Sequence, residues 1–307
     1  MRGPGGAPEP SKESTVPDAP GTLYLVATPI GNLADFPPRA LEALRQCDLV
    51  AAEDTRVTRK LLTRFQVSKP LVSYHAHNQA ARGADLARQL SQGRVVALVS
   101  DAGAPCLSDP GTDLARLAWE AGCRVVPIPG PSAVVAALMA SGLPASPFYF
   151  HGFLDPRPDR RRGELEGLKG LRATLVFFEA PHRLRACLAD LLSALGPRQA
   201  ASCRELTKLH EEIERGGLEE LAARFRGREP RGEFTLVVAG AGKGAAAPPA
   251  EEWREWSLEE HLARLTARGR SLNEAIAEAA RARGLDRREV YRVGHGLKPG
   301  RPGAGAE

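Results

Sequence analysis

The chain has 307 residues, a formal net charge of +5 and an isoelectric point of about 9.1. This length leaves room for two domains and a smaller third one, and no apolar stretch approaches the roughly 20 residues that span a bilayer, which excludes a helical membrane protein. The positive charge suits a polyanionic partner, although charge alone does not identify one.

The amino-terminal segment and the cysteines indicate an intracellular location. Residues 1–21 are rich in Gly, Pro, Ser and Glu and have no apolar core, so we predict a disordered leader and not a signal peptide. The five cysteines each lie in or beside an apolar run, without C-x-x-C spacing, at Cys47, Cys106, Cys123, Cys187 and Cys203. This usage is typical of reduced core residues and not of a zinc site or a disulfide framework. We therefore expect a cytoplasmic protein without a metal centre.

Residues 22–141 alternate predicted strands with predicted helices. The strands are expected at 22–27, 49–52, 95–100 and 124–128, and the helices at 39–46, 78–92 and 113–121. This alternation predicts a βα repeat that builds a mostly parallel sheet, and hence an amino-terminal α/β domain. The Gly- and Pro-rich segment 141–147 is typical of a linker after that domain.

Three of the predicted strands end in loops that could hold a ligand, at 28–32 (TPIGN), 100–111 (SDAGAPCLSDPG) and 129–133 (PGPSA). Ligands of parallel sheets bind beyond the carboxyl ends of the strands, which places Asp101 and the amides near Gly103 and Ala104 at such a site. Taken alone, the 100–111 loop could also be an ordinary turn capped by Asp. Neither G-x-G-x-x-G nor G-x-x-x-x-G-K-[ST] occurs, so a nicotinamide site and a P-loop are both disfavoured. We expect a nucleoside-like cofactor held by backbone atoms.

A second group of elements predicts another α/β domain over residues 142–240. Its strands are expected at 148–152, 174–178, 200–204 and 234–239, and its helices at 181–195 and 218–225. Glu211 and Glu212 are expected on a helix after the 200–204 strand. The cofactor is expected in the cleft between the two domains.

The carboxyl-terminal part predicts a small three-helix module over residues 253–297, after a flexible linker at 241–252 and before a disordered tail at 298–307. Each helix is predicted to begin at a capping box, at Ser257/Glu260, Ser271/Glu274 and Asp286/Glu289. Gly269 and Gly284 are predicted to end the first two helices. The module resembles a helix-turn-helix unit. Arg287, Arg288 and Arg292, with Arg283, form a candidate phosphate-facing patch. The alternative is a solvated arginine surface on a module that mediates dimerisation.

Nine ordered motifs carry a resemblance that spans about Thr22 to Gly240. They are TPIGN, AAEDTR, SDAGAPCLSDPG, PGPSA, SGLP, HGFL, EAPHR, CRELTK and GEF. Together they resemble the tetrapyrrole-methylase-type S-adenosylmethionine (SAM) methyltransferases. More narrowly, they are similar to the ribosomal small-subunit methyltransferase I group, bacterial enzymes that methylate the ribose 2′-OH of a cytidine in the decoding centre of 16S rRNA. The resemblance implies the tetrapyrrole methylase fold, SAM as cofactor, 16S rRNA or the small ribosomal subunit as partner, and a homodimer.

The resemblance also implies where the cofactor binds. Asp101, Gly103 and Ala104 match one binding loop of the family, and Ser132 and Ala133 match its PGxSA loop. Two positions depart from the family pattern, because Ala104 stands where Thr is usual and Cys106 where an aliphatic residue is usual. Ala104 therefore leaves only a backbone contact at that position.

Methyl transfer to a hydroxyl needs alignment of the attacking oxygen and removal of its proton. We predict that Glu205 and Lys208, which follow a strand, act on the ribose hydroxyl, because a cation that stabilises an alkoxide matters as much as a base. Arg56, His182 and Arg183 are predicted to bind the substrate, the arginines through its phosphates.

Structural ion pairs are the alternative for these charged residues. Glu53 with Arg56, and Glu205 with Lys208, could be salt bridges that only shape the cleft. His75 and His77 are interpreted as loop residues or RNA contacts and not as metal ligands.

Two further functions remain open besides rRNA 2′-O-methylation. One is methylation of a tetrapyrrole, against which the basic carboxyl-terminal module counts, because a free macrocycle does not require it. The other is a ribosome-binding factor that holds SAM without catalysis.

Overall fold

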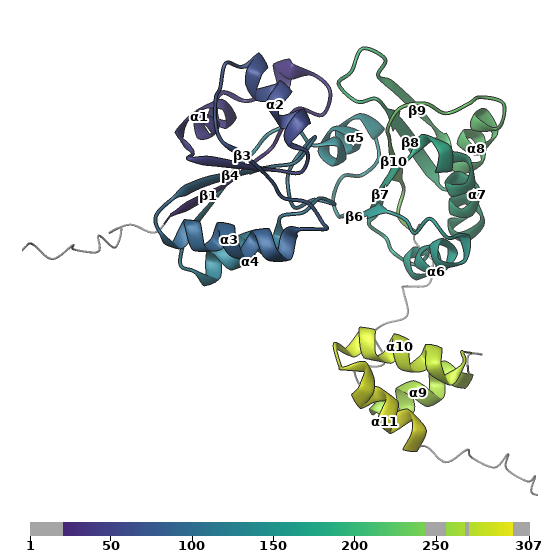
Figure 1. Cartoon of the computed structure of the whole chain (residues 1–307). Coiled ribbons are helices and arrows are strands. Elements are labelled where there is room, and N and C mark those ends of the chain that lie inside the picture. The colour runs from purple at the N-terminus through teal and green to yellow at the C-terminus, as the bar shows by residue number, and fades with distance from the viewer. Residues whose placement is uncertain (1–20, 243–255, 268–269, 297–307) are drawn as a thin grey trace, which may run out of the picture. The chain divides into compact units, whose positions relative to one another are not determined.

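The computed structural model describes residues 21–242, 256–267 and 270–296 (Figure 1). The predicted leader except Gly21, the predicted tail and most of the predicted linker lie outside the described residues. Two compact units are present, divided between Ala245 and Ala246, and each is described by itself. No helix in the described ranges is long and apolar enough to cross a membrane.

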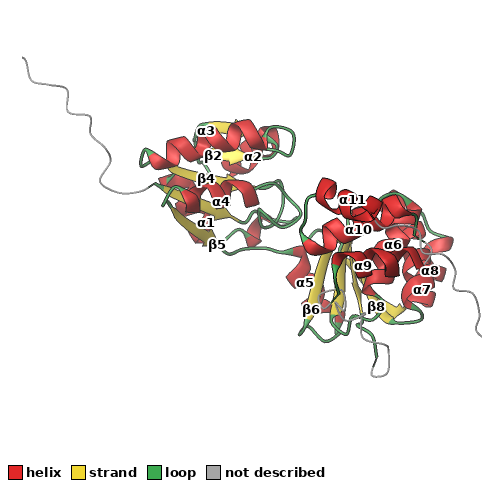
Figure 2. Ribbon diagram, turned by 90° about the horizontal axis from the view of Figure 1, so that it is seen from below, coloured by secondary structure: helices red, strands yellow, loops and turns green. Residues whose placement is uncertain are grey.

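The first lobe is a five-stranded parallel sheet in the order β3-β2-β4-β1-β5. Its strands are β1 (Thr22–Val26), β2 (Leu49–Ala52), β3 (Leu71–Ser73), β4 (Val95–Val99) and β5 (Arg124–Ile128). Its helices are α1 (Pro38–Gln46), α2 (Thr55–Arg64), α3 (Gln79–Ser91) and α4 (Thr112–Glu120). Separate apolar clusters fill the α1/α2 side and the α3/α4 side, and Figure 2 shows helices on both sides of the strands. Burial on both faces explains why β2 and β4 are uninterrupted apolar runs.

The second lobe is a mixed sheet in the order β6-β7-β10-β8-β9. Its strands are β6 (Phe148–Phe153), β7 (Thr174–Glu179), β8 (Gln199–Arg204), β9 (Glu212–Gly217) and β10 (Phe234–Val238). Its helices are α5 (Ala133–Ser141), α6 (Pro158–Leu168), α7 (Leu184–Leu195) and α8 (Leu218–Arg226). Helices α6, α7 and α8 cover one face, and α5 packs on the other against β8 and β10. The predicted fold class, two α/β sheets followed by carboxyl-terminal helices, is confirmed.

Several elements differ from the sequence prediction. The expectation that Glu211 and Glu212 lie on a helix was wrong, because Glu212 begins the edge strand β9. Glu212 and Glu214, two residues apart, share one face of this strand and both pair with Arg228. Strand β3 and helices α2 and α6 were not predicted. Helix α6 carries many charges and two glycines, so its sequence gives only a weak helical signal.

The carboxyl-terminal unit contains α9 (Leu258–Ala267), α10 (Leu272–Arg283) and α11 (Arg287–Gly296). Apolar side chains from all three helices form its core, among them Leu262, Ile276 and Val290.

The helix caps of this unit follow the prediction in two of three cases. The Ser257/Glu260 and Ser271/Glu274 boxes are both formed, and Gly284 ends α10 in the left-handed conformation at φ +65°. Asp286 differs, because its carboxylate accepts the N–H of Arg288 at 2.7 Å instead of forming a box with Glu289. Gly269 lies outside the described residues.

Candidate functional site

The three predicted ligand loops meet at the carboxyl edge of the first sheet. Strand β1 lies between β4 and β5 and is parallel to both, so the loops that follow these strands leave the sheet side by side. The Thr28 and Gly103 backbones exchange two hydrogen bonds, of 2.8 and 3.1 Å, and the Thr28 hydroxyl donates to the Ser100 carbonyl. Gly103 has φ +79°, and a Cβ atom built there would lie 3.4 Å from Ile30 Cγ2. The space would admit a Cβ atom, but the positive φ would strain any residue other than glycine at this position.

The loop after β4 is held in an unusual backbone conformation. Cys106 and Ser108 have φ +71° and +66°, values that non-glycine residues rarely adopt. Gly111 is required nearby, because a Cβ atom there would lie 2.6 Å from Cys106 Sγ and 2.8 Å from Leu98 Cδ2. Strained backbone of this kind persists where the surrounding structure enforces it, often at functional sites. Here it brings Ser108 and Asp109 to the edge of a pocket.

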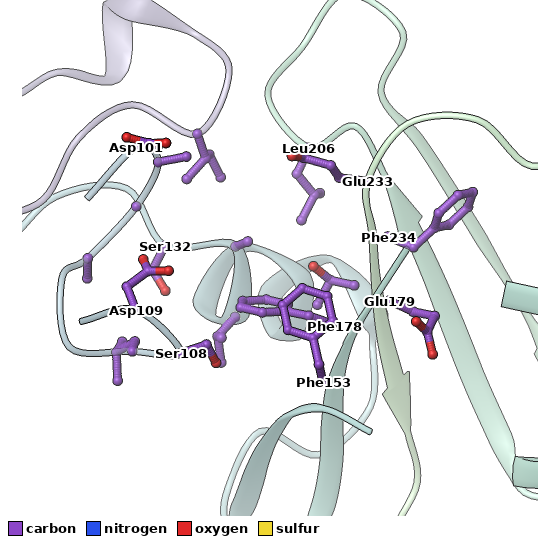
Figure 3. A pocket seen from close by; sticks show the side chains of 18 of the residues that line it. Asp101, Ser108, Asp109, Ser132, Phe153, Phe178, Glu179, Leu206, Glu233 and Phe234 are labelled. Carbon is purple, nitrogen blue, oxygen red and sulfur yellow. The ribbon is translucent and has the colours of Figure 1, made fainter. Parts of the chain in front are cut away.

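A pocket of about 440 Å³ lies between these loops and the second sheet, within the first compact unit. Figure 3 shows Asp101, Asp109 and Ser132 on one side and Leu206 on the other, with Phe153 and Phe178 below. All five residues predicted to bind the cofactor line this pocket, namely Asp101, Gly103, Ala104, Ser132 and Ala133. Ser132 also caps α5, because its hydroxyl accepts the N–H of Val135. The volume is in the range of small-molecule sites.

All the charged side chains that line the pocket are acidic. Glu53, Asp101, Asp109 and Glu233 line it, and of the described residues around it none is Lys, Arg or His. Burial and the neighbouring Glu53 carboxylate raise the pKa of Asp109 to about 6. Burial and the Asp101 carboxylate also raise the pKa of Glu53. Such a pocket attracts a cationic ligand and repels phosphate.

The residues predicted to bind the cofactor included neither Asp109 nor Glu53, although Glu53 was considered as a charged residue of the cleft. The SDPG turn that contains Asp109 was recognised only as part of the loop after the strand. A second Asp eight residues after Asp101, in a Gly- and Pro-rich loop, was the signal that could have identified it.

Glu179 contributes to the wall of the pocket but its carboxylate points away from the enclosed space (Figure 3). Its side chain is fully buried, and its Oε1 lies 3.2 Å from Arg183 Nε. Arg183 also donates to the Leu154 carbonyl, and its side chain is 19% exposed. Arg183 is therefore held by neighbours within the second lobe, whereas His182 beside it is exposed. The Arg183 guanidinium group is therefore less accessible to a phosphate than we expected from the sequence.

Glu205 and Lys208 lie together next to the pocket, without lining it. Lys208 Nζ donates to Glu205 Oε1 and to Glu233 Oε2, both at 2.9 Å, and Glu205 Oε1 also accepts the N–H of Glu233. Burial lowers the pKa of Lys208, but the bonds to both carboxylates outweigh it, so the pKa of Lys208 is raised overall. Burial raises the pKa of Glu205, and the Lys208 bond outweighs that effect, so the pKa of Glu205 is lowered overall. Lys208 is thus a positive charge fixed in position by two carboxylates, and Glu205 is a weak proton acceptor.

Lys208 also packs against one of the ligand loops. A Cβ atom built at Gly31 would lie 2.3 Å from Lys208 Cγ. The absence of a side chain at Gly31 therefore makes room for Lys208, and Ile30 next to it lines the pocket.

Arg56 lies at the start of α2, on the rim formed by the first lobe. It pairs with Asp54 at 2.6 Å and not with Glu53, the partner considered from the sequence, and its side chain is 85% exposed. Hydrogen bonds from Arg56 lower the pKa of Asp54 to about 2. The Asp54 N–H in turn donates to Asp101 Oδ1 at 2.9 Å, so Asp101 also orders the start of α2.

The remaining candidate residues lie elsewhere. His75 and His77 follow β3 in a turn, as expected for loop residues. Arg287, Arg288 and Arg292 are all exposed on α11 of the carboxyl-terminal unit. Within the described ranges, no group of three or more His, Cys, Asp or Glu side chains is placed to hold a metal ion.

Known proteins resemble the chain along most of its length. Residues 22–222 match the family of tetrapyrrole (corrin/porphyrin) methylases. The chain is 48% identical, over 91% of its own length and 96% of the relative, to a ribosomal RNA small subunit methyltransferase I of Halalkalibacterium halodurans. It is 42% identical to the protein of the same name in Bacillus subtilis, over 90% of this chain and 94% of that one. Among solved structures, the uroporphyrin-III-C-methyltransferase from Thermus thermophilus matches with a TM-score of 0.51 at 26% identity, covering 71% of this chain and 94% of that one.

Proposed function

Because the chain belongs to the tetrapyrrole methylase family, whose members use SAM as methyl donor, we propose that it methylates 16S rRNA at the ribose 2′-OH of a cytidine in the decoding centre. Two relatives that are 42% and 48% identical bear the name of ribosomal RNA small subunit methyltransferase I, which supports the rRNA substrate. A ribosomal substrate also implies a cytoplasmic location. The acidic pocket is the structural observation that supports the use of SAM as methyl donor.

The residues of the pocket fit SAM. When bound, SAM supplies a methyl group on a positively charged sulfur, and its amino-acid part carries an ammonium group. Glu53, Asp101 and Asp109 would complement these positive charges, while the amide of Ala104 and the hydroxyl of Ser132 offer polar contacts. The Gly103 N–H is already donated to the Thr28 carbonyl. The apolar side chains, Ile30, Phe153, Phe178 and Leu206, suit the nucleoside part. A nucleotide cofactor with several phosphates would be repelled.

The affinity for SAM is expected to fall as the pH falls through 6. A carboxyl group loses its negative charge below its pKa, and the pKa of Asp109 is about 6. Protonation of Asp109 removes one attraction for a cationic ligand, so we expect the affinity to fall about fivefold between pH 7.5 and 5.0. Isothermal titration of wild type and Asp109→Asn separates this effect from the titration of SAM itself. The same pH dependence in both proteins would contradict the assignment to Asp109.

The proposed catalytic step uses Lys208 and Glu205. Lys208 remains protonated, because its pKa is raised, and so it would stabilise the negative charge that develops on the ribose oxygen. The ribose oxygen would form its bond to the methyl group as the methyl–sulfur bond breaks, and the hydroxyl proton would pass to solvent water. Glu205 would position Lys208 through their 2.9 Å bond. Arg56 and Arg183 are proposed to contact the RNA phosphates, and His182 is proposed to contact the substrate. Of the two arginines, Arg56 is the more exposed and is therefore better placed to contact a phosphate.

The proposed role of the carboxyl-terminal module, residues 253–297, is to bind RNA. The exposed arginines of α11 can each meet a phosphate, and binding through phosphates weakens as salt increases. Truncation after Gly242 retains Ala241, whose N–H bonds the Leu171 carbonyl, so the second lobe keeps its last contact. We expect this truncation to raise the KM for the small subunit about tenfold while the affinity for SAM is unchanged.

A matched variant tests the arginines directly. Replacing Arg287, Arg288 and Arg292 with Gln should flatten the dependence of log K on log salt by about 0.7 to 0.9 for each lost phosphate contact. If truncation leaves both the KM and the salt dependence at wild-type values, the module serves assembly or stability instead.

A homodimer is proposed from the resemblance and from the outer surface of α5. This helix is apolar around its whole circumference, and Val135 and Met139, one turn apart, are 51% and 80% exposed. Apolar side chains that share an exposed helix face are typical of an interface. The mass of the protein in solution, measured by sedimentation, tests this proposal.

One assay distinguishes the three candidate functions. Radiolabelled methyl transfer from SAM is measured with small ribosomal subunits, with naked 16S rRNA and with a tetrapyrrole as acceptors. The proposed function requires label in rRNA that is recovered as 2′-O-methylcytidine after digestion to nucleosides. Label in the tetrapyrrole alone would support the small-molecule enzyme. Binding of SAM and subunits without transfer would support the non-catalytic factor.

A further inference from the structure

Helix α2 has a charge unlike that of its neighbours. It carries Arg56, Arg59, Lys60 and Arg64 and no acidic residue. Among the described α-helices of residues 21–242, every other one that has a cation also has an Asp or Glu. A general bias toward arginine in the composition would add basic residues to all helices alike, and α2 would then carry acidic residues as its neighbours do. The basic composition of α2 is therefore a local feature.

Three of these cations form a straight stripe on the exposed face of α2. Arg56, Lys60 and Arg64 follow one another at intervals of four residues, opposite the buried Thr58 and Leu62. With a rise of 1.5 Å for each residue, the stripe is about 12 Å long.

Arg59 widens this basic surface at one side of the stripe. It lines a second pocket, of about 320 Å³, together with Lys69 and the hydroxyl residues Thr63 and Ser68. No acidic residue lines this pocket. We call the four helical cations, Arg56, Arg59, Lys60 and Arg64, the α2 basic face.

The α2 basic face destabilises its helix when no partner is bound. Like charges four residues apart repel each other and destabilise a helix. Within the described part of the chain, the side chains of Arg59, Lys60 and Arg64 have neither an ion pair nor a hydrogen bond. By contrast, cations on α3, α4 and α8 pair with acids on the same helix. A negatively charged partner would remove the repulsion.

The position of the face relates it to the acidic pocket. Helix α2 begins two residues after Glu53, which lines the pocket, and the Asp54 between them is bonded to Asp101. A substrate with a phosphate backbone is repelled by the pocket carboxylates, so its backbone must be held outside the pocket while the target group reaches it. The α2 basic face offers the opposite charge, and its first residue, Arg56, lies three residues after the pocket-lining Glu53.

We propose that the α2 basic face binds the phosphates of the RNA strand that flanks the methylated nucleotide. The proposal rests on the proposed function, because it assumes an RNA substrate. Arg59, Lys60 and Arg64 are then positioning residues that hold the backbone and take no part in methyl transfer.

The test compares two triple variants of the full-length protein with equal net charge. Arg59, Lys60 and Arg64 are replaced with Gln in the first, and Arg88, Arg116 and Arg124 in the control. The control residues are exposed and lie on α3, on α4 and at the amino end of β5. Gln matches Arg and Lys in helix propensity at the helical positions, and Arg124 is exposed at the end of its strand, so both proteins should fold.

We expect the α2 variant to bind small subunits about tenfold more weakly at 100 mM salt, with a salt slope lower by about 2. Its affinity for SAM and its single-turnover rate at saturating substrate should be unchanged, and the control should behave as wild type. Replacing Arg59 and Arg64 with Lys keeps the charge and should restore binding. Because the variant loses a like-charge repulsion, its Tm should not fall.

Specific results would overturn the proposal. A KM and salt slope equal to those of the control would do so, as would a loss of Tm that accounts for the loss of binding. Normal binding to naked 16S rRNA with weaker binding to subunits would assign the face to a ribosomal protein and also overturn it. If the wild type methylates no RNA, the proposed function itself fails. An active wild type with an unaffected α2 variant refutes only this inference.

Discussion

Replacing Lys208 with Ala is expected to slow single-turnover methylation of the small subunit at least about 100-fold. Lys208 lies beside the pocket and is held in place by two carboxylates at 2.9 Å each, and its raised pKa keeps it charged. Loss of a positioned positive charge affects the transition state more than the ground state, so the affinities for SAM and RNA should persist. Rapid-quench measurement of methyl transfer with saturating enzyme gives the rate.

Three further variants separate catalysis from structure. Lys208→Arg retains the charge and should lose less of the rate, and Glu205→Gln should give a smaller decrease because Glu233 still holds Lys208. Gly31→Ala leaves Lys208 intact but places a Cβ atom 2.3 Å from its Cγ, so displacement of Lys208 should also slow transfer. A parallel loss of Tm and rate in the Lys208 variant would instead favour a salt bridge that only shapes the cleft.

The affinity for SAM is expected to fall at least about tenfold, or about 1.4 kcal/mol, when Asp101 is replaced with Ala. Asp101 lies two residues after the end of β4 and lines the pocket, so its negative charge would lie close to the cationic parts of SAM. Isothermal titration measures the affinity of the folded variant.

Asp101→Asn is the matched control for loop order. Asp101 Oδ1 accepts the N–H of Asp54, and Asn retains an oxygen for this bond while the charge is lost. If charge governs binding, Asn and Ala should weaken it alike. Recovery of wild-type affinity in the Asn variant would show that the side chain acts by ordering the start of α2. Full affinity in both variants would remove Asp101 from the site.

The elements that could be predicted from the sequence depend on local signals. The apolar run from Val95 to Val99, followed at once by Gly, Pro and Asp, identifies a buried strand and its ligand loop without any knowledge of the fold. The capping boxes at Ser257 and Ser271 likewise involve residues three apart, so the helix starts were predictable. Strand β9 was missed because its polar alternation is stabilised by Arg228 from outside the strand.

By itself, the sequence determined the parallel first sheet, the second α/β sheet, the final three helices and the loops that carry the site. Only the tertiary structure decided how charged residues act on one another. The raised pKa of Asp109 depends on burial and on Glu53, which is 56 residues away in the chain. Lys208 obtains its second carboxylate from Glu233, which precedes a different strand. The physical reason is that strand order brings together side chains from distant segments, and both burial and Coulomb interactions depend on that proximity and not on spacing along the chain.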